Sequence, residues 1–136
     1  MSDFSNYYED KIIDHMIRGE AFTAPVTVYV ALFTADSGLE ANLPTAEVTE
    51  GGYARESVTL SASSGGATSN SASVEFDAAT EDWTAVTHFA IVDHLTNTNW
   101  GTDVNVLMWD ALTTPRTCTD GNQLKFAATT LTVTVA

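Results

Sequence analysis

The sequence predicts a mainly β protein, an antiparallel β-sandwich of roughly six to eight short strands with one N-terminal amphipathic α-helix. Apolar residues recur at every fourth position near the start of the chain. After Pro25 the pattern changes to short runs rich in β-branched and aromatic residues. Clusters of Gly, Ser and Asn separate these runs. A chain of 136 residues needs one core, so we expect a single domain over residues 1–136.

The predicted helix covers residues 3–18. Its apolar stripe comprises Phe4, Tyr8, Ile12, Ile13, Met16 and Ile17. Gly19 follows where a left-handed cap is expected. The stripe must be covered, so the helix either caps an open end of its own sheets or docks on a partner, and we favour self-capping. Tyr7 and Tyr8, which have apolar rings and polar tips, suit either role and are candidate contact residues.

The strands are predicted between residues 26 and 135. Their ranges are 26–34, 53–60, 71–76, 86–93, 106–112, 123–127 and 130–135. The first run, VTVYVALFT, is apolar on both alternating faces, which predicts a central strand covered on both sides. Residues 36–52 have no period and combine Gly, Pro, Asn and acids, so we expect a long exposed loop. Gly65–Gly66 predicts the turn of a hairpin within the serine-rich stretch.

Charge and composition exclude several classes of function. Eighteen Asp and Glu against five Lys and Arg give a formal net charge of −13, which repels nucleic acid and anionic lipid. The opening residues lack the basic start and apolar run of a secretory signal, and no window is apolar enough to span a membrane. A single cysteine, Cys118, excludes an internal disulfide. We therefore expect neither a nucleic-acid nor a membrane partner.

The stretch VTHFAIVDH, residues 86–94, contains residue types that build metal and acid–base sites. In a strand, His88 and His94 share one face and lie about 20 Å apart, while Asp93 points to the other face. They therefore cannot bind one zinc ion within that strand. We expect His88 to be half-buried, donating to a neighbouring carbonyl or lying under Trp83.

No sequence pattern supports an enzyme. The chain has no G-x-S-x-G elbow, and its Gly-Gly pairs lack the lysine and helix of a phosphate-binding loop. We predict no catalytic residue, metal, cofactor or small-molecule substrate. The acid-rich loop over residues 36–50 is most simply explained by solubility, with an irregular calcium site as the alternative.

Three further residues are candidates for contact with partners. Trp100 lies in an NTNWGT turn, where it either packs on its own sheet or is exposed as a contact anchor. Arg55 and Arg116 are rare cations in an acidic chain. We expect each to form a forked pair with a carboxylate, either within the fold or across a subunit boundary.

Several motifs together resemble a family of small tailed-phage virion proteins, whose members are described as tail-fibre-like or head-decoration proteins. They are Y-V-A-L-F-T-A-D (29–36), G-G-Y-A-R (51–55), S-N-S-A-S-V-E-F (69–76), W-T-A-V-T-H-F-A-I-V-D (83–93), L-M-W-D-A-L-T (107–113) and L-T-V-T (131–134). The resemblance covers nearly the whole chain, including FSNYYEDKIIDH at residues 4–15. It implies a β-rich structural subunit without catalytic residues.

From this resemblance we expect a capsid decoration, or cement, protein that stabilises the outer head shell. Its expected partners are the major capsid protein and copies of itself in a homo-oligomer. Its expected location is the virion, assembled in the host cytoplasm. The alternative is a tail or tail-fibre component, including one that binds host glycans through Trp100 and Asp103.

Overall fold

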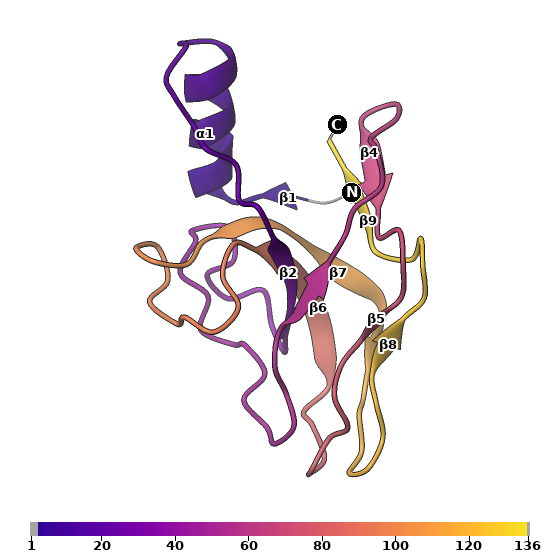
Figure 1. Cartoon of the computed structure of the whole chain (residues 1–136). Helices are drawn as coiled ribbons and strands as arrows, with labels where there is room; N and C mark the ends of the chain where they lie inside the picture. Colours follow the sequence, from indigo (N-terminus) through magenta and orange to yellow (C-terminus); the bar gives the residue numbers. More distant parts are fainter. Residues whose placement is uncertain (1–2, 136) are drawn as a thin grey trace.

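The computed structural model describes residues 3–135 and is mainly β, as the sequence predicts (Figure 1). Within that range the chain forms one helix and nine strands. In order they are β1 (Asp3–Phe4), α1 (Asn6–Met16), β2 (Val28–Phe33), β3 (Glu56–Val58), β4 (Ala67–Ser69), β5 (Val74–Glu75), β6 (Val86–Val92), β7 (Val106–Arg116), β8 (Lys125–Phe126) and β9 (Thr132–Thr134). The helix and seven of the strands follow the predicted order, whereas β1 and β4 were not predicted, and most strands are shorter than predicted.

Five strands form one antiparallel sheet in the order β1-β7-β6-β2-β3. Two-stranded ladders, β4–β9 and β5–β8, form the second layer. The register places Val30 opposite Ile91 and Leu32 opposite Phe89, so these four apolar residues share one face of the sheet. As Figure 1 shows, β4 and β9 project beyond the sheet on the same side as α1.

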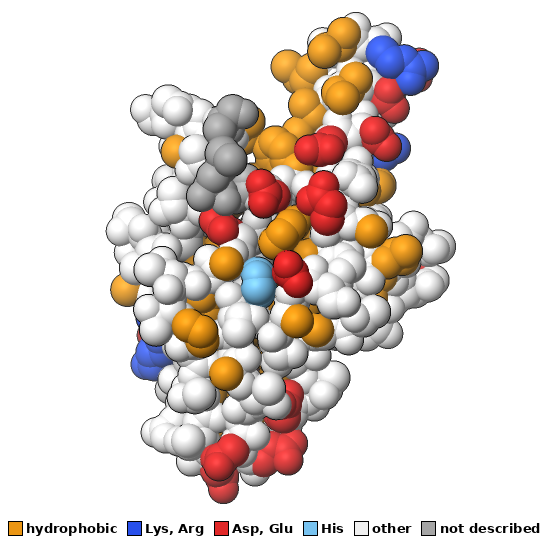
Figure 2. All heavy atoms as spheres, turned by 180° about the vertical axis from the view of Figure 1, so that it is seen from behind, with side chains coloured by type: hydrophobic (Ala, Val, Ile, Leu, Met, Phe, Trp, Pro, Cys, Tyr) orange, Lys and Arg blue, Asp and Glu red, His pale blue; other side chains and the backbone are white. Residues whose placement is uncertain are grey.

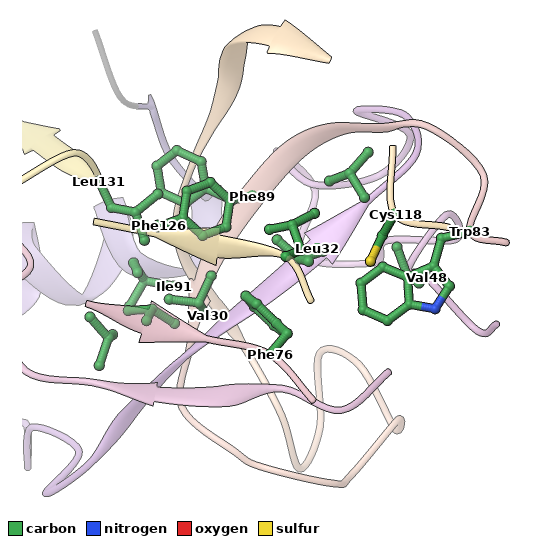
Figure 3. Close-up of a cluster of buried hydrophobic side chains, with 14 of the residues drawn as sticks. Val30, Leu32, Val48, Phe76, Trp83, Phe89, Ile91, Cys118, Phe126 and Leu131 are labelled. Atoms are coloured by element: carbon green, nitrogen blue, oxygen red, sulfur yellow. The ribbon is translucent and has the colours of Figure 1, made fainter. Parts of the chain in front are cut away.

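The main core lies between the five-stranded sheet and the two ladders. Side chains of the sheet point toward side chains of the second layer, which lie in or beside β5, β8 and β9 and include Phe76, Phe126 and Leu131 (Figure 3). These three residues are almost completely buried. All three lie within predicted strands, at 71–76, 123–127 and 130–135, where one face of each strand must be apolar to be buried.

A second, smaller apolar cluster covers the opposite face of the sheet. Ala31 and Phe33 of β2 pack there with Leu39, which is fully buried in the loop before β3. The prediction of a long exposed loop at residues 36–52 is therefore wrong in part. Val48 from the same loop reaches the main core. Leu39 and Val48 are isolated apolar residues that form no periodic pattern, so the sequence did not predict their burial. Between them they cover both faces of β2.

Asn42 fastens this loop to the body of the protein. Its side chain donates to Asn105 Oδ1 at 2.9 Å and accepts the Val106 N–H at 2.7 Å. Asn105 in turn binds both carboxylate oxygens of Asp93. Asn42 has a φ of 60°, a left-handed conformation that asparagine tolerates better than most residues.

The helix begins at Asn6, three residues later than predicted, because Asp3 and Phe4 pair with β7 instead. Ser5 caps the helix by accepting the Tyr8 N–H, and its own hydroxyl donates to the carbonyl oxygen of Val106. Ser5 is completely buried, so it joins the base of α1 to the sheet.

The hairpin turn at Gly65–Gly66 is confirmed, and it is tighter than predicted. Both glycines have positive φ, 61° and 79°, as a two-residue type I′ turn requires. Ser64 and Ala67 exchange backbone hydrogen bonds across it. Strand β4 begins immediately afterwards, between the predicted strands 53–60 and 71–76, and it pairs with the distant β9.

Candidate interaction site

Arg55 lies just before β3 and is 5% exposed. Its Nε donates to Glu47 Oε1 at 2.7 Å and a terminal nitrogen donates to Glu47 Oε2 at 2.8 Å, which forms a forked ion pair. The other terminal nitrogen donates to the carbonyl oxygens of His94 and Asn97 at 2.8 and 2.9 Å. One guanidinium therefore joins the loop before β3 to the loop between β6 and β7.

Tyr53 completes the hydrogen bonding of Glu47. Its hydroxyl donates to Glu47 Oε1 at 2.9 Å and accepts the Leu32 N–H at 3.0 Å. Burial, with the negative charge of Glu47 adding to it, raises the pKa of Tyr53 well above its ordinary value. The hydroxyl thus stays protonated as a structural donor.

Trp100 packs on its own fold and is half-buried. The Arg55 guanidinium lies 4.7 Å from the centre of its ring, and the Phe33 ring lies 6.2 Å away. Asp103, the other residue of the predicted glycan site, accepts a hydrogen bond from Asn99 at 2.8 Å. We call Glu47, Tyr53, Arg55 and Trp100 the Arg55 cluster. In this cluster Arg55 pairs with a carboxylate of its own chain and not across a subunit boundary. Trp100 packs on its own fold and is not an exposed contact anchor.

An open groove of about 680 Å³ lies beside this cluster. Tyr29 and Ser57, which are opposite each other on β2 and β3, line it together with Leu95 and several hydroxyl side chains. Among the described residues no histidine or cysteine lines the groove, and four of the five guanidinium N–H groups of Arg55 are already hydrogen-bonded. The groove therefore has the shape of an open contact surface.

The histidines have structural surroundings. His88 is half-buried, with Nδ1 2.7 Å from Thr87 Oγ1 and its ring 6.0 Å from that of Trp109. The predicted contact of His88 with Trp83 is wrong, because Trp83 lies in the main core and its indole N–H donates to a loop carbonyl. His94 is exposed, and its Nδ1 accepts two backbone N–H groups of the following turn.

Two carboxylates of the acidic loop, those of Glu47 and Glu50, bind groups within the fold. Glu50 accepts the N–H groups of Thr84 at 2.8 Å and Thr49 at 3.0 Å. Hydrogen bonds from Thr84 lower the pKa of Glu50 to about 2. Across residues 3–135 no three His, Cys, Asp or Glu side chains lie close enough together to hold a metal ion.

Helix α1 meets the sheet at its base. Tyr7 and Tyr8 are half-buried there against the main core, and the Tyr8 ring lies 5.4 Å from that of Phe4. Burial, followed by the charge of Asp93, raises the pKa of Tyr7. Figure 1 shows the rest of the helix projecting away from the sheet.

The free half of α1 exposes a patch of large apolar side chains. Ile13, Met16 and Ile17 are 50%, 74% and 79% exposed, and we call these three residues the helix patch. Hydrophobic side chains gather along one edge of the projecting helix, and charged ones along the other (Figure 2). The favoured prediction of self-capping is therefore wrong for this half, because the helix points away from the open ends of the sheet.

Arg116 is exposed at the end of β7. Its guanidinium donates to the Lys125 carbonyl oxygen and lies 4.9 Å from the centre of the Phe126 ring. This contact differs from the predicted carboxylate pair. Arg116 therefore joins β7 to β8. Its side chain is also exposed, and its contact with a partner stays a prediction.

Comparison with known proteins gives one family match. Residues 3–134 match the family described as "Podophage GP4 fiber I protein gp80". No curated protein matches the chain. Among the described residues, no helix is long and apolar enough to cross a membrane.

Proposed function

Because the chain belongs to the Podophage GP4 fiber I protein gp80 family, we propose that it is a structural subunit of a podophage tail fibre. The family is one of virion structural proteins of tailed phages, which makes the chain a virion component. The match carries the proposal because it runs over residues 3–134, from β1 to β9.

The arrangement of polar groups supports a role in which the protein acts through its surfaces and not as an enzyme. In the Arg55 cluster the charged and hydroxyl groups bind one another, and the pKa of Tyr53 is moved away from neutrality. General acid–base catalysis at neutral pH needs the opposite arrangement, with a pKa near 7 beside an open substrate position.

Capsid decoration, the role first expected from the sequence, has no support in the family description, which names a fibre. Binding to the major capsid protein, self-association and assembly in the host cytoplasm stay predictions. The glycan alternative at Trp100 and Asp103 is weakened, since Arg55 and Phe33 pack against that indole ring.

Imaging of intact particles tests the proposal. A short peptide tag can be inserted at the exposed Gly65–Gly66 turn, and tagged particles can be labelled with a gold-conjugated antibody. We expect label on fibres at a single vertex, with few copies per particle relative to the major capsid protein. Label spread over the shell, with hundreds of copies, would establish decoration and refute the fibre role.

A further inference from the structure

The helix patch lies beside acidic side chains. Glu9 and Asp10 are exposed one helical turn before Ile13, so their carboxylates rim the patch at its N-terminal end. None of the ion pairs between residues 3 and 135 involves Glu9 or Asp10. A surface that covers this patch must therefore bury three large apolar side chains and also accommodate two acids.

The five cations of this chain are already used within it. Arg18 pairs with Asp14 at 2.6 Å, and Lys125 lies 3.5 Å from Glu75. Arg55 is buried with Glu47, as described above. The remaining two lie over aromatic rings of their own chain, Lys11 over Tyr7 and Arg116 over Phe126.

A second copy of the chain is consequently a poor partner for the helix patch. Of the eighteen acids, five lie in residues 3–20, which leaves thirteen in residues 21–135 against three bases. Docking the acidic rim on such a body brings like charges together, which costs free energy at an interface. Pairing two helix patches across a two-fold axis brings the same acids close to each other.

We propose that the helix patch docks into an apolar groove on a different virion protein, and that Lys or Arg side chains rimming this groove pair with Glu9 and Asp10. The proposal rests on the fibre function above and specifies the chemistry of the partner. An amphipathic helix that lays its apolar face into a groove is a recurring mode of recognition. Burial of Ile13, Met16 and Ile17 provides affinity, and the acids provide orientation and a faster encounter.

Binding to particles that lack this chain tests the proposal. Such particles are purified from an infection in which a stop codon interrupts its gene, and are then mixed with the purified protein. Bound copies are counted by quantitative gel electrophoresis at about 50 mM and about 500 mM NaCl. We expect binding to fall by about tenfold or more at the higher salt, because screening weakens the pairing of acids with a basic rim.

Two pairs of variants separate the apolar contribution from the charge contribution. The patch variant, Ile13→Asp with Ile17→Asp, is compared with Val26→Asp and Val135→Asp, which alter exposed apolar residues elsewhere. The rim variant, Glu9→Lys with Asp10→Lys, is compared with Asp36→Lys and Asp120→Lys, which change the net charge equally. We expect at least about tenfold weaker binding for the patch and rim variants and little change for the controls. Circular dichroism and thermal unfolding check that every variant is folded.

The alternative outcomes are distinct. Folded patch and rim variants that bind as well as the wild type would overturn the inference while leaving the fibre function intact. Self-association that strengthens with salt and disappears in the patch variant, measured by sedimentation of the free protein, would identify a second copy as the partner and also overturn it. A chain absent from the fibres of native particles would instead refute the proposed function.

Discussion

The Arg55 cluster and the helix patch have opposite surroundings. In the cluster, one buried guanidinium makes four hydrogen bonds and lies against an indole ring. In the patch, three aliphatic side chains are half or more exposed, and the helix that carries them has no buried residue. The first region stabilises the fold itself, whereas the second is available for contact with another molecule.

This difference in exposure shows which of the candidate residues are accessible to other molecules. Arg55 was a candidate contact residue because cations are rare in this sequence, yet its guanidinium is buried and bound to Glu47 and to two backbone carbonyl groups. The apolar stripe of α1 was expected to be covered by the protein's own sheets, yet part of it is left open. Mutations in the two regions should therefore affect different measurements, namely the free energy of unfolding for the cluster and binding to the virion for the patch.

Removing the guanidinium should have the largest effect. Arg55→Ala leaves Glu47 half-buried without its cation, and we expect the free energy of unfolding to fall by about 3–5 kcal/mol. Urea denaturation followed by tryptophan fluorescence measures the change. Arg55→Lys keeps the charge but cannot form the forked pair, so a smaller loss is expected. A loss below about 1 kcal/mol for Arg55→Ala would show that the cluster does not stabilise the fold.

A second mutation tests the loop that connects to the cluster. Asn42→Ala removes the acceptor of the Val106 N–H and places an alanine in a left-handed conformation, so we expect a loss of about 2–3 kcal/mol. Denaturation curves provide the measurement. Leu43→Ala, at the neighbouring exposed position, should cost less than about 0.5 kcal/mol. Equal effects at the two positions would contradict the role assigned to the Asn42 side chain.

The third prediction concerns the pH dependence of stability. The pKa of Glu50 is about 2 in the folded protein, below its ordinary value of 4.5, so the unfolded chain binds more protons between these values. The stabilisation from Glu50 should therefore be complete above pH 4.5 and be lost as the pH falls toward 2. Glu50→Gln should be less stable at neutral pH, with a flatter dependence in this window. Unfolding curves at several pH values test this, and Glu40→Gln, in the same loop, should keep the wild-type dependence.

The smallest effect on stability is expected in the helix patch. Ile17→Ala and Met16→Ala should each change the free energy of unfolding by less than about 0.5 kcal/mol, because these side chains are mostly exposed. Ile91→Ala deletes a buried isoleucine and should cost about 2–5 kcal/mol in the same assay. If Ile17→Ala cost as much as Ile91→Ala, the patch would belong to the core, and the contrast between the two regions would disappear.

Local patterns predicted the parts of the fold that local physics controls. Alternation identified β2 and its two covered faces, because side chains of a strand point to opposite sides. The Gly65–Gly66 pair predicted its turn, because both positions need positive φ. The start of α1 was misplaced because Phe4 fits the helical stripe equally well, and only its pairing with β7 decides the matter.

The contacts that define the candidate sites are mostly long-range, and the sequence does not encode them locally. A carboxylate partner for Arg55 was expected, but Glu47 could not be singled out among nine acids in the surrounding stretch. Asn42 and Asn105 belong to no motif, and their contact depends on how the loop folds over the sheet. The direction of α1 follows from the burial of Ser5, which no helical pattern reveals.

Ser5 also determines how the projecting helix transmits a mechanical load. Its backbone N–H donates to the carbonyl oxygen of Leu107, its hydroxyl donates to Val106, and the next N–H donates to Glu40. These hydrogen bonds fix the base of α1, which is about 16 Å long, to the sheet and to the loop before β3. A sideways force at its tip would therefore pass directly into β7, next to the middle strand of the sheet, so tension on the particle would be carried by the folded body.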